Sequence, residues 1–331
     1  GDYQQARQVQ NDALARSRRI LGEDHPETLI SAAQLGLVLW SLGDYKQQTR
    51  QLQNDTFTRS RRILGDDHPT ALAAAYVLGL VLWTLGDYQQ ARQLQNDTFT
   101  RSRRILGDDQ FITLHSASIL GLTLNSLGEH QQARQLQEEA VTRSRRMLGE
   151  GHPVTLRTAS LLGLTLESLG EHRQARHLQN DTLTRLRRVL GRDHAYTLRS
   201  ASILGLTLNS LGEHQHARQL QNDTLIRLRR VLGDDHPETL ISATRLAADL
   251  RELGEYEQAR ELDDDTLARR RRVLGDDHPD TLTSAHNLAV DLRARGEYQR
   301  ARELDEGTLT GTGTVLNRTA LAQKSWYRRV S

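Results

Sequence analysis

Apolar residues recur along this chain at three-to-four-residue spacing, in segments that glycine interrupts. Between residues 69 and 107, Leu72, Leu78 and Leu85 belong to one such segment, which ends at Gly86. A second segment follows and ends at Gly107. This spacing predicts amphipathic α-helices, and a glycine just past the last apolar position predicts a helix end. The stretch therefore predicts two helices of about 17–20 residues each.

The two-helix pattern repeats almost throughout the chain. A Leu-Gly pair recurs every 42 residues, except for a first interval of 43, and a second glycine follows each pair after 21 residues. The glycines of the Leu-Gly pairs are Gly22, Gly65, Gly107, Gly149, Gly191, Gly233 and Gly275. Two equal helical halves per unit predict a stack of hairpins, each of which buries its apolar stripe against its neighbours. The predicted fold class is all-α.

The last complete unit carries a recognisable motif. Residues 274–282 read Leu-Gly-Asp-Asp-His-Pro-Asp-Thr-Leu, and His-Asn-Leu-Ala (286–289) and Gly-Glu-Tyr (296–298) follow. The unit resembles a tetratricopeptide repeat, in the 42-residue form of kinesin light chains and of bacterial, including actinobacterial, STAND-type signalling proteins. The resemblance implies a right-handed α-α solenoid that binds proteins or peptides in its concave groove, as the recognition region of a larger signalling protein.

The repeats define the expected domain organisation. Residues 1–306 form the array, with units that start near 1, 43, 86, 128, 170, 212, 254 and 296, and residues 307–331 form a divergent cap or tail. The chain opens on a second helix, 3–21, without its first helix, so we expect a fragment or a helix that another domain or chain covers. One extra residue between 44 and 50 predicts a longer turn or a π-bulge.

Composition excludes several functions. The formal charge is only +2, there is no cysteine, and the longest apolar run, 71–83, is too short to span a bilayer. No phosphate-binding loop, nucleophile elbow or zinc-protease motif occurs. We expect a cytoplasmic protein without cofactor, metal or catalytic activity. Arginine supplies nearly all the basic charge, which suggests a GC-rich, bacterial source.

Candidate partner-binding residues lie on the first helices, which line the concave groove in the resembled family. One position per unit is expected to point into the groove: Val77, Ile119, Leu161, Ile203, Arg245 and Asn287. Four aliphatic side chains provide roughly 6–12 kcal/mol when covered, against an association cost of about 4–15 kcal/mol. Arg157, Arg199 and Arg245 are the expected anchors for an acidic or C-terminal segment. The alternative is that tight packing buries the aliphatic row between adjacent helices.

Two further interpretations remain open. The second helices carry an arginine triplet, such as Arg59, Arg61 and Arg62, and a ladder of arginines grips phosphates in nucleic acids. An aspartate four residues before the first arginine, at Asp55, Asp97, Asp181, Asp223 and Asp265, favours a structural helix pair instead, so nucleic acid is an unlikely partner. Self-association through the helix 3–21 is the other alternative. Thirteen histidines fall mostly in two fixed slots, and nothing near them indicates a metal site.

Overall fold

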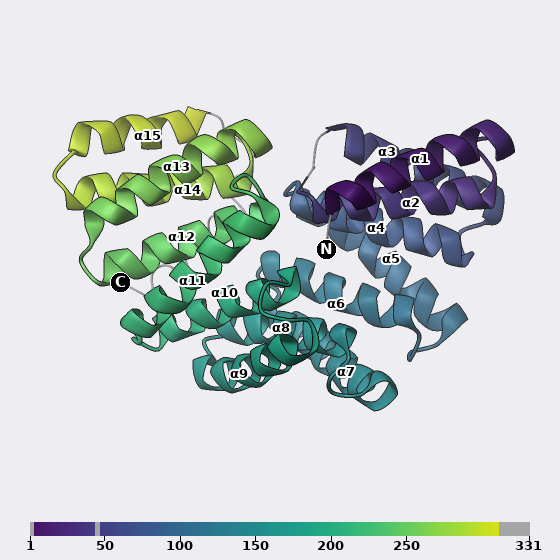
Figure 1. Cartoon of the computed structure of the whole chain (residues 1–331), viewed down its shortest axis with the longest axis horizontal. Coiled ribbons are helices and arrows are strands. Elements are labelled where there is room, and N and C mark those ends of the chain that lie inside the picture. Colours follow the sequence, from purple (N-terminus) through teal and green to yellow (C-terminus); the bar gives the residue numbers. More distant parts are fainter. Residues whose placement is uncertain (1–2, 44–46, 311–331) are drawn as a thin grey trace. The chain divides into compact units, whose positions relative to one another are not determined.

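A computed structural model describes residues 3–43 and 47–310 of the chain (Figure 1). All fifteen helices in these residues are α-helices. The first helices of the units are α2 (Pro26–Ser41), α4 (Pro69–Thr84), α6 (Phe111–Ser126), α8 (Pro153–Ser168), α10 (Ala195–Ser210), α12 (Pro237–Glu252) and α14 (Pro279–Ala294). The second helices are α1 (Tyr3–Leu21), α3 (Gln47–Leu64), α5 (Tyr88–Leu106), α7 (His130–Leu148), α9 (His172–Val189), α11 (His214–Leu232), α13 (Tyr256–Leu274) and α15 (Tyr298–Thr310). The predicted all-α hairpin repeat is confirmed.

The helix ends follow the predicted signals. Gly107 closes α5 with φ 94°, in the left-handed region that favours glycine. Proline opens α4, and the preceding residue, His68, caps this helix, because its Nδ1 accepts a hydrogen bond from the Thr70 amide at 3.2 Å. His25, His152, His194, His236 and His278 make the same bond. The histidine slot before the first helices is therefore an N-cap, which satisfies an amide that the helix leaves unpaired.

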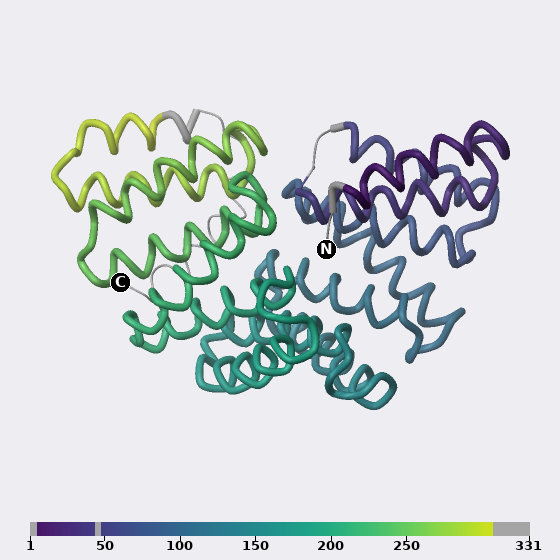
Figure 2. The backbone as a smooth tube through the Cα atoms, in the orientation of Figure 1, coloured from purple at the N-terminus to yellow at the C-terminus, as the bar shows by residue number. Residues whose placement is uncertain are grey.

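The chain divides into two compact units, Gly1–Leu161 and Leu162–Ser331. Successive helices pack together from α1 to α7 in the first unit and from α9 to α15 in the second, and the tube in Figure 2 follows this up-and-down course. First helices also touch each other, as α2 and α4 do. Each hairpin is thus held by its own partner and by the hairpins beside it.

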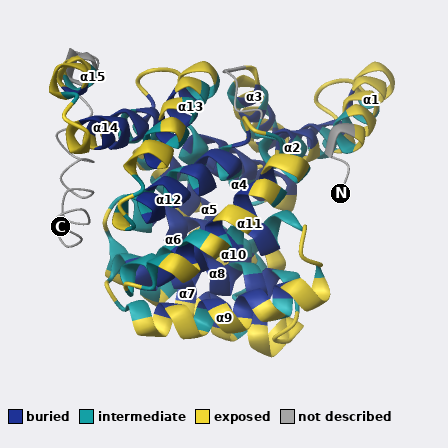
Figure 3. Ribbon diagram, turned by 60° about the vertical axis from the view of Figure 1, so that its left-hand side comes forward, coloured by how far each residue is buried: buried dark blue, intermediate teal, exposed yellow. Residues whose placement is uncertain are grey.

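The core consists of one small cluster per hairpin. In the first unit, Leu78 and Leu82 of α4 are buried with Ala91 of α5, and Phe57 of α3 packs against them. In the second, Leu246 and Leu250 of α12 take the same role. Figure 3 shows mostly buried first helices beside second helices with exposed stripes. The core positions expected from the sequence, such as Leu35 and Leu39, are 4% and 8% exposed.

Two expectations concern residues that lie partly outside the described ranges. The extra residue near 44–50 falls partly on 44–46, which lie outside the described residues, as does the expected cap or tail from 311 onward. The helix α15 continues to Thr310, four residues beyond the array end expected at 306. No helix among the described residues is long and apolar enough to cross a membrane.

Candidate binding surface

The structure buries the four aliphatic residues expected to line the groove. Their exposed fractions are 5%, 4%, 2% and 1%, for Val77, Ile119, Leu161 and Ile203 respectively. The first helices that carry them are apolar on nearly every side. In α6, for example, every residue from Ser116 to Leu124 is buried. A helix that is hydrophobic on all sides is usually buried. These four side chains therefore lie between adjacent helices, as in the alternative that tight packing buries the aliphatic row. Contact of the four with a partner stays a prediction, which requires the helices to separate.

The more accessible part of the first helices is one turn nearer their N-terminal ends. There the row reads Ile30, Ala73, His115 and Arg157 in the first unit, and Arg199, Ile241 and Thr283 in the second, and each of these residues is partly exposed. This row contains two of the three expected arginine anchors. The surface available to a partner is therefore shorter and more polar than the expected aliphatic ladder.

A cluster of four side chains forms on this row in the first unit. Arg157 of α8 donates hydrogen bonds to His115 Nδ1 of α6 at 2.8 Å and to the Tyr76 hydroxyl of α4 at 3.4 Å. The Phe111 ring stacks on the His115 ring at a centroid distance of 3.9 Å, and Phe111 is 57% exposed. We call Tyr76, Phe111, His115 and Arg157 the inner cluster. Side chains two repeats apart meet in it, as happens on the inner side of a superhelix.

The inner cluster holds His115 in its neutral form. Burial lowers the pKa of His115 to about 2, and the charge of Arg157 adds to the effect. A neutral ring whose Nδ1 accepts from Arg157 carries its proton on Nε2. That buried Nε2 has no hydrogen-bond partner among the described residues. The cluster therefore combines a guanidinium, an exposed aromatic ring and a buried, unsatisfied donor within one small area.

Sequence reasoning identified Arg157 in this cluster but missed Tyr76 and Phe111. A signal existed for Phe111, because it stands at the first helical position where most units have proline. Tyr76 stands where other units have small or polar residues, such as Ser118, Ser160 and Ser202. Aromatic residues are only 4% of this chain, so their departure from the repeat pattern was informative.

In the second unit the expected anchors already have partners within the chain. Arg199 forms an ion pair with Glu238 at 3.4 Å. Arg245 donates to the Ser202 hydroxyl at 2.8 Å, and burial lowers the pKa of Arg245 to about 10. Asn287 is only 2% exposed. Arg199 keeps 17% of its side chain exposed and Arg245 is also partly exposed, but both are engaged within the chain.

Buried charged groups connect helices in the last two repeats. Arg251 bonds both Asp263, at 2.5 Å, and Asp291, at 3.1 Å, and neither carboxylate is exposed to solvent. Asp249 accepts a hydrogen bond from Asn209 at 2.6 Å. Burial raises the pKa of Asp249 and of Asp263 to about 7 in each case. These groups connect adjacent helices, so they serve the stack and do not face a partner.

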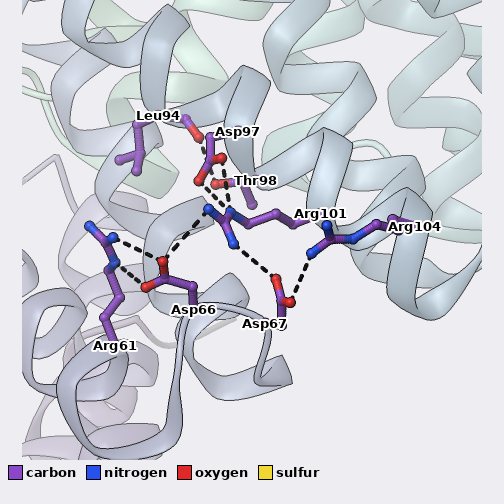
Figure 4. A network of polar contacts seen from close by, with 8 residues as sticks. All are labelled: Arg61, Asp66, Asp67, Leu94, Asp97, Thr98, Arg101 and Arg104. Atoms are coloured by element: carbon purple, nitrogen blue, oxygen red, sulfur yellow. Dashed lines mark hydrogen bonds and ion pairs between the residues drawn. The ribbon is translucent and has the colours of Figure 1, made fainter.

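The arginine triplets form a second set of contacts, between the repeats (Figure 4). Arg101 bonds Asp97 of its own helix at 2.8 Å and Asp67 of the preceding loop at 3.0 Å. Arg104 also bonds Asp67, at 2.8 Å, while Arg61 bonds Asp66 at 2.5 Å. The expected aspartate–arginine pairs within helices are confirmed. The pairs between a loop and the next repeat, which sequence spacing does not show, neutralise much of the remaining arginine charge.

Among the described residues, no group of three or more histidine and acidic side chains is placed to hold a metal ion. The second histidine slot is occupied by local contacts instead. His130 lies 2.7 Å from Asn125, and His172 lies 3.0 Å from Glu167.

These features together define a class of protein: helical-hairpin repeats whose first helices carry a small, partly exposed polar and aromatic surface. The chain belongs to the tetratricopeptide repeat family, whose model matches residues 1–47, 47–104, 109–188, 168–225, 204–265 and 238–310.

Several solved structures are similar to this chain. A putative kinesin light chain from Podosopora anserina, with nearly identical repeats, is 27% identical over 60% of this chain and 94% of that one, with a TM-score of 0.49. NprR in complex with its cognate peptide NprX is 15% identical over 99% of this chain and 93% of that one, with a TM-score of 0.65. A Rap protein complexed with competence and sporulation factor is 9% identical over 90% and 88%, also with a TM-score of 0.65. No curated protein matches the sequence.

Proposed function

We propose that this chain is a non-catalytic repeat scaffold that binds a protein or peptide partner on the inner cluster and the row beside it. The observation that carries the proposal is the inner cluster itself, where Arg157, His115 and the 57% exposed Phe111 come together on the inner side of the first unit. Aromatic residues and arginine are the side chains that contribute most to binding energy at protein interfaces.

The chemistry of the cluster favours a ligand segment with an acceptor and a flat or apolar group. A carboxylate or backbone carbonyl satisfies the His115 Nε2 donor and shares the Arg157 guanidinium, while Phe111 offers its ring to an apolar side chain. An acidic or C-terminal segment fits this description. Two proteins of similar fold, NprR and Rap, are seen with a peptide and with competence and sporulation factor respectively. We further propose that the chain serves a larger bacterial signalling protein in the cytoplasm.

A peptide selection tests the site. Displayed peptides are selected on the wild-type protein and on Arg157→Glu and Phe111→Ala variants, with Arg173→Ala, an exposed change on α9, as the matched control. We expect peptides enriched on wild type and on the control to lose at least tenfold in affinity on both cluster variants. Peptides that bind all four proteins equally would place the site elsewhere on the chain.

Self-association is a second candidate function, and one observation favours it. The helix α1 packs against α2 and exposes Val9, Ile20 and Leu21 by 58%, 66% and 44%. Exposed apolar residues on one helix mark an interaction surface, and here we propose a second copy of the chain as the occupant. Light scattering over a concentration series separates the candidates, since a mass that stays monomeric rules out self-association. A Val9→Asp, Ile20→Asp variant must abolish any dimer that forms.

A further inference from the structure

One loop of the array reverses the charge that every other loop carries at the same position. The residue after the glycine of each Leu-Gly pair is acidic in the other units, and in the fifth it is Arg192. The acidic residues at this position are Glu23, Asp66, Asp108, Glu150, Asp234 and Asp276. A single substitution therefore exchanges a negative for a positive charge within an otherwise repeated setting.

The reversal removes the partner of a neighbouring arginine. In four of the other units the middle arginine of the triplet bonds this acid, as in Arg61–Asp66 and Arg103–Asp108, both at 2.5 Å. Arg187 is the middle arginine of the fifth unit, and Arg192 now stands where its acid would be. Over residues 3–43 and 47–310, no carboxylate pairs with either Arg187 or Arg192. Two like charges on adjacent elements repel each other unless an anion comes between them.

A crevice opens at this position between α9, α10 and α11. Its polar lining includes Arg187, Arg192, Thr197, Arg227 and the carboxylate of Asp223, and its volume is about 90 Å³. The first repeat has the corresponding crevice between α1, α2 and α3. Equivalent residues line it, with Glu23 in place of Arg192, and its volume is about 10 Å³. The repeat thus provides its own comparison: where the acid is present the crevice is nearly closed, and where arginine replaces it the crevice has room for a small oxyanion.

The groups around the crevice carry a positive surplus. Arg227 is 2.9 Å from Asp223 and 2.8 Å from Asp193, and Arg230 is 2.7 Å from Asp193, so both carboxylates are already engaged. Arg187 and Arg192 add two positive charges that these carboxylates do not balance. In the first repeat, Glu23 stands at the position of Arg192 and pairs with Arg59 at 2.8 Å. The crevice of the fifth repeat thus has the positive charge of Arg192 where the crevice of the first repeat has the negative charge of Glu23.

One further donor lies at the same place. The Thr197 hydroxyl is buried, with the residue 1% exposed, and it has no hydrogen-bond partner among the described residues. The equivalent Thr113 and Thr239 each donate to the carbonyl of the glycine before their loop, at 2.8 Å, whereas the hydroxyls of Thr28, Thr155 and Thr281 lack a partner as that of Thr197 does. The Thr197 hydroxyl is thus available to an anion in the wider crevice of the fifth repeat.

We propose that the crevice formed by Arg187, Arg192, Thr197 and Arg227 is a binding site for a phosphate-type oxyanion. The anion lies between the two unpaired guanidinium groups and accepts the Thr197 hydroxyl, because arginine binds phosphate through paired N–H donors. Free inorganic phosphate and the phosphoryl group of a phosphorylated peptide share this chemistry. The site is separate from the inner cluster and does not depend on the function proposed for it.

Calorimetric titration with inorganic phosphate, at constant ionic strength held with chloride, tests the site on the whole chain. We expect wild type to bind phosphate and Arg192→Asp, which restores the residue of other units, to lose at least tenfold in affinity while its helicity is unchanged. The converse variant, Glu23→Arg, recreates the same residue set in the first unit and is expected to add a second site. A parallel titration with a phosphoserine peptide and its unphosphorylated form identifies the source of the phosphoryl group.

The outcomes are distinguishable. Tighter binding of the phosphoserine peptide than of free phosphate assigns the site to a phosphorylated segment, and the reverse order assigns it to the free ion. Wild type that binds neither probe, or an Arg192→Asp variant that binds phosphate as wild type does, overturns the proposal.

Discussion

At the scale of single residues, a matched pair of side chains sets how closely the two helices of a hairpin approach. Gln53 of α3 is fully buried and donates to the Ala32 carbonyl of α2 at 3.1 Å. A Cβ added at Gly36 would lie 2.0 Å from Gln53 Nε2. The next four units keep this glycine–glutamine pair, but the last two replace it with alanine and aspartate, as at Ala247 and Asp263. The longer side chain therefore occurs where the neighbour has no Cβ.

Gly36→Ala tests this pairing. Alanine gains about 1 kcal/mol in helix propensity, yet it must displace a buried, hydrogen-bonded side chain, and overpacking costs about 1–3 kcal/mol. We expect a net loss of stability in urea unfolding, and a smaller loss when Gln53→Asn shortens the neighbour in the same protein. If the losses of stability from Gly36→Ala and Gln53→Asn simply add, the contact between residues 36 and 53 does not limit how closely α2 and α3 pack.

The buried Asp249 makes stability depend on pH. Its folded-state pKa, raised by burial from 3.8 to about 7, lies above that of the unfolded chain, so the folded state holds a proton that the unfolded state has released. Stability therefore falls as the pH rises through this window, by at most about 4 kcal/mol for a shift of about three units.

Asp249→Asn removes this titration and still lets residue 249 accept from Asn209. We expect urea unfolding to show a gain in stability at about pH 8, a much smaller difference at about pH 4, and a flatter pH profile between them. A variant whose profile parallels that of wild type would assign the pH dependence to other groups.

At the scale of the helix and its loop, the arginine triplet joins one repeat to the next. Arg101 connects α5 to the loop that follows α3, through Asp66 and Asp67. Exposed ion pairs are worth roughly 0.2–1 kcal/mol each, and Arg101 is 28% exposed with three carboxylates around it. The network thus contributes modestly at each junction and repeats along the array.

Arg101→Ala is expected to lower the free energy of unfolding by about 1 kcal/mol, with the loss reduced at high salt. Arg187→Ala is the control for loss of an arginine side chain, because Arg187 is the middle arginine of a triplet whose loop acid is missing. In phosphate-free buffer we expect that control to change stability by less than about 0.5 kcal/mol. Equal losses for the two variants would mean that the side-chain stems, and not the ion pairs, stabilise the junctions.

The elements were more predictable from the sequence than the surface they form. Glycine positions and helical spacing gave the hairpins, and Asp97–Arg101 was evident because four residues make one helical turn. The pairing of Arg101 with Asp67 was not evident, since it depends on how near one hairpin lies to the next. The burial of Ile119 and Ile203 was one of two open alternatives for the same reason: a period shows which face a residue is on, but not how tightly that face is covered.

At the scale of the whole molecule, each described hairpin is stabilised by its neighbours and by no distant element. Leu78 is 4% exposed in a cluster shared by α3, α4 and α5. Leu78→Ala removes a buried side chain at a cost of about 2–5 kcal/mol, and in a repeat array that cost falls mainly on adjacent units. Hydrogen exchange should therefore accelerate in α2–α6 and remain as in wild type in α14. Faster exchange along the entire chain would indicate a single cooperative unit instead.

The ion pairs between a loop and the arginines of the next repeat have a consequence for how such a chain gains or loses repeats in evolution. Asp67 belongs to one repeat, and Arg101 and Arg104, which hold it, belong to the next. Most units therefore carry an acid for their successor and a base for their predecessor, although the fourth has Gly151 at the position of Asp67. Gain or loss of whole units by unequal recombination leaves most junctions with complementary partners, and the identical segments 54–67 and 96–109 are the trace expected of such an event. Once a repeat has been duplicated, one copy can change a single loop charge, as the copy with Arg192 has done, and this weakens only one junction between repeats.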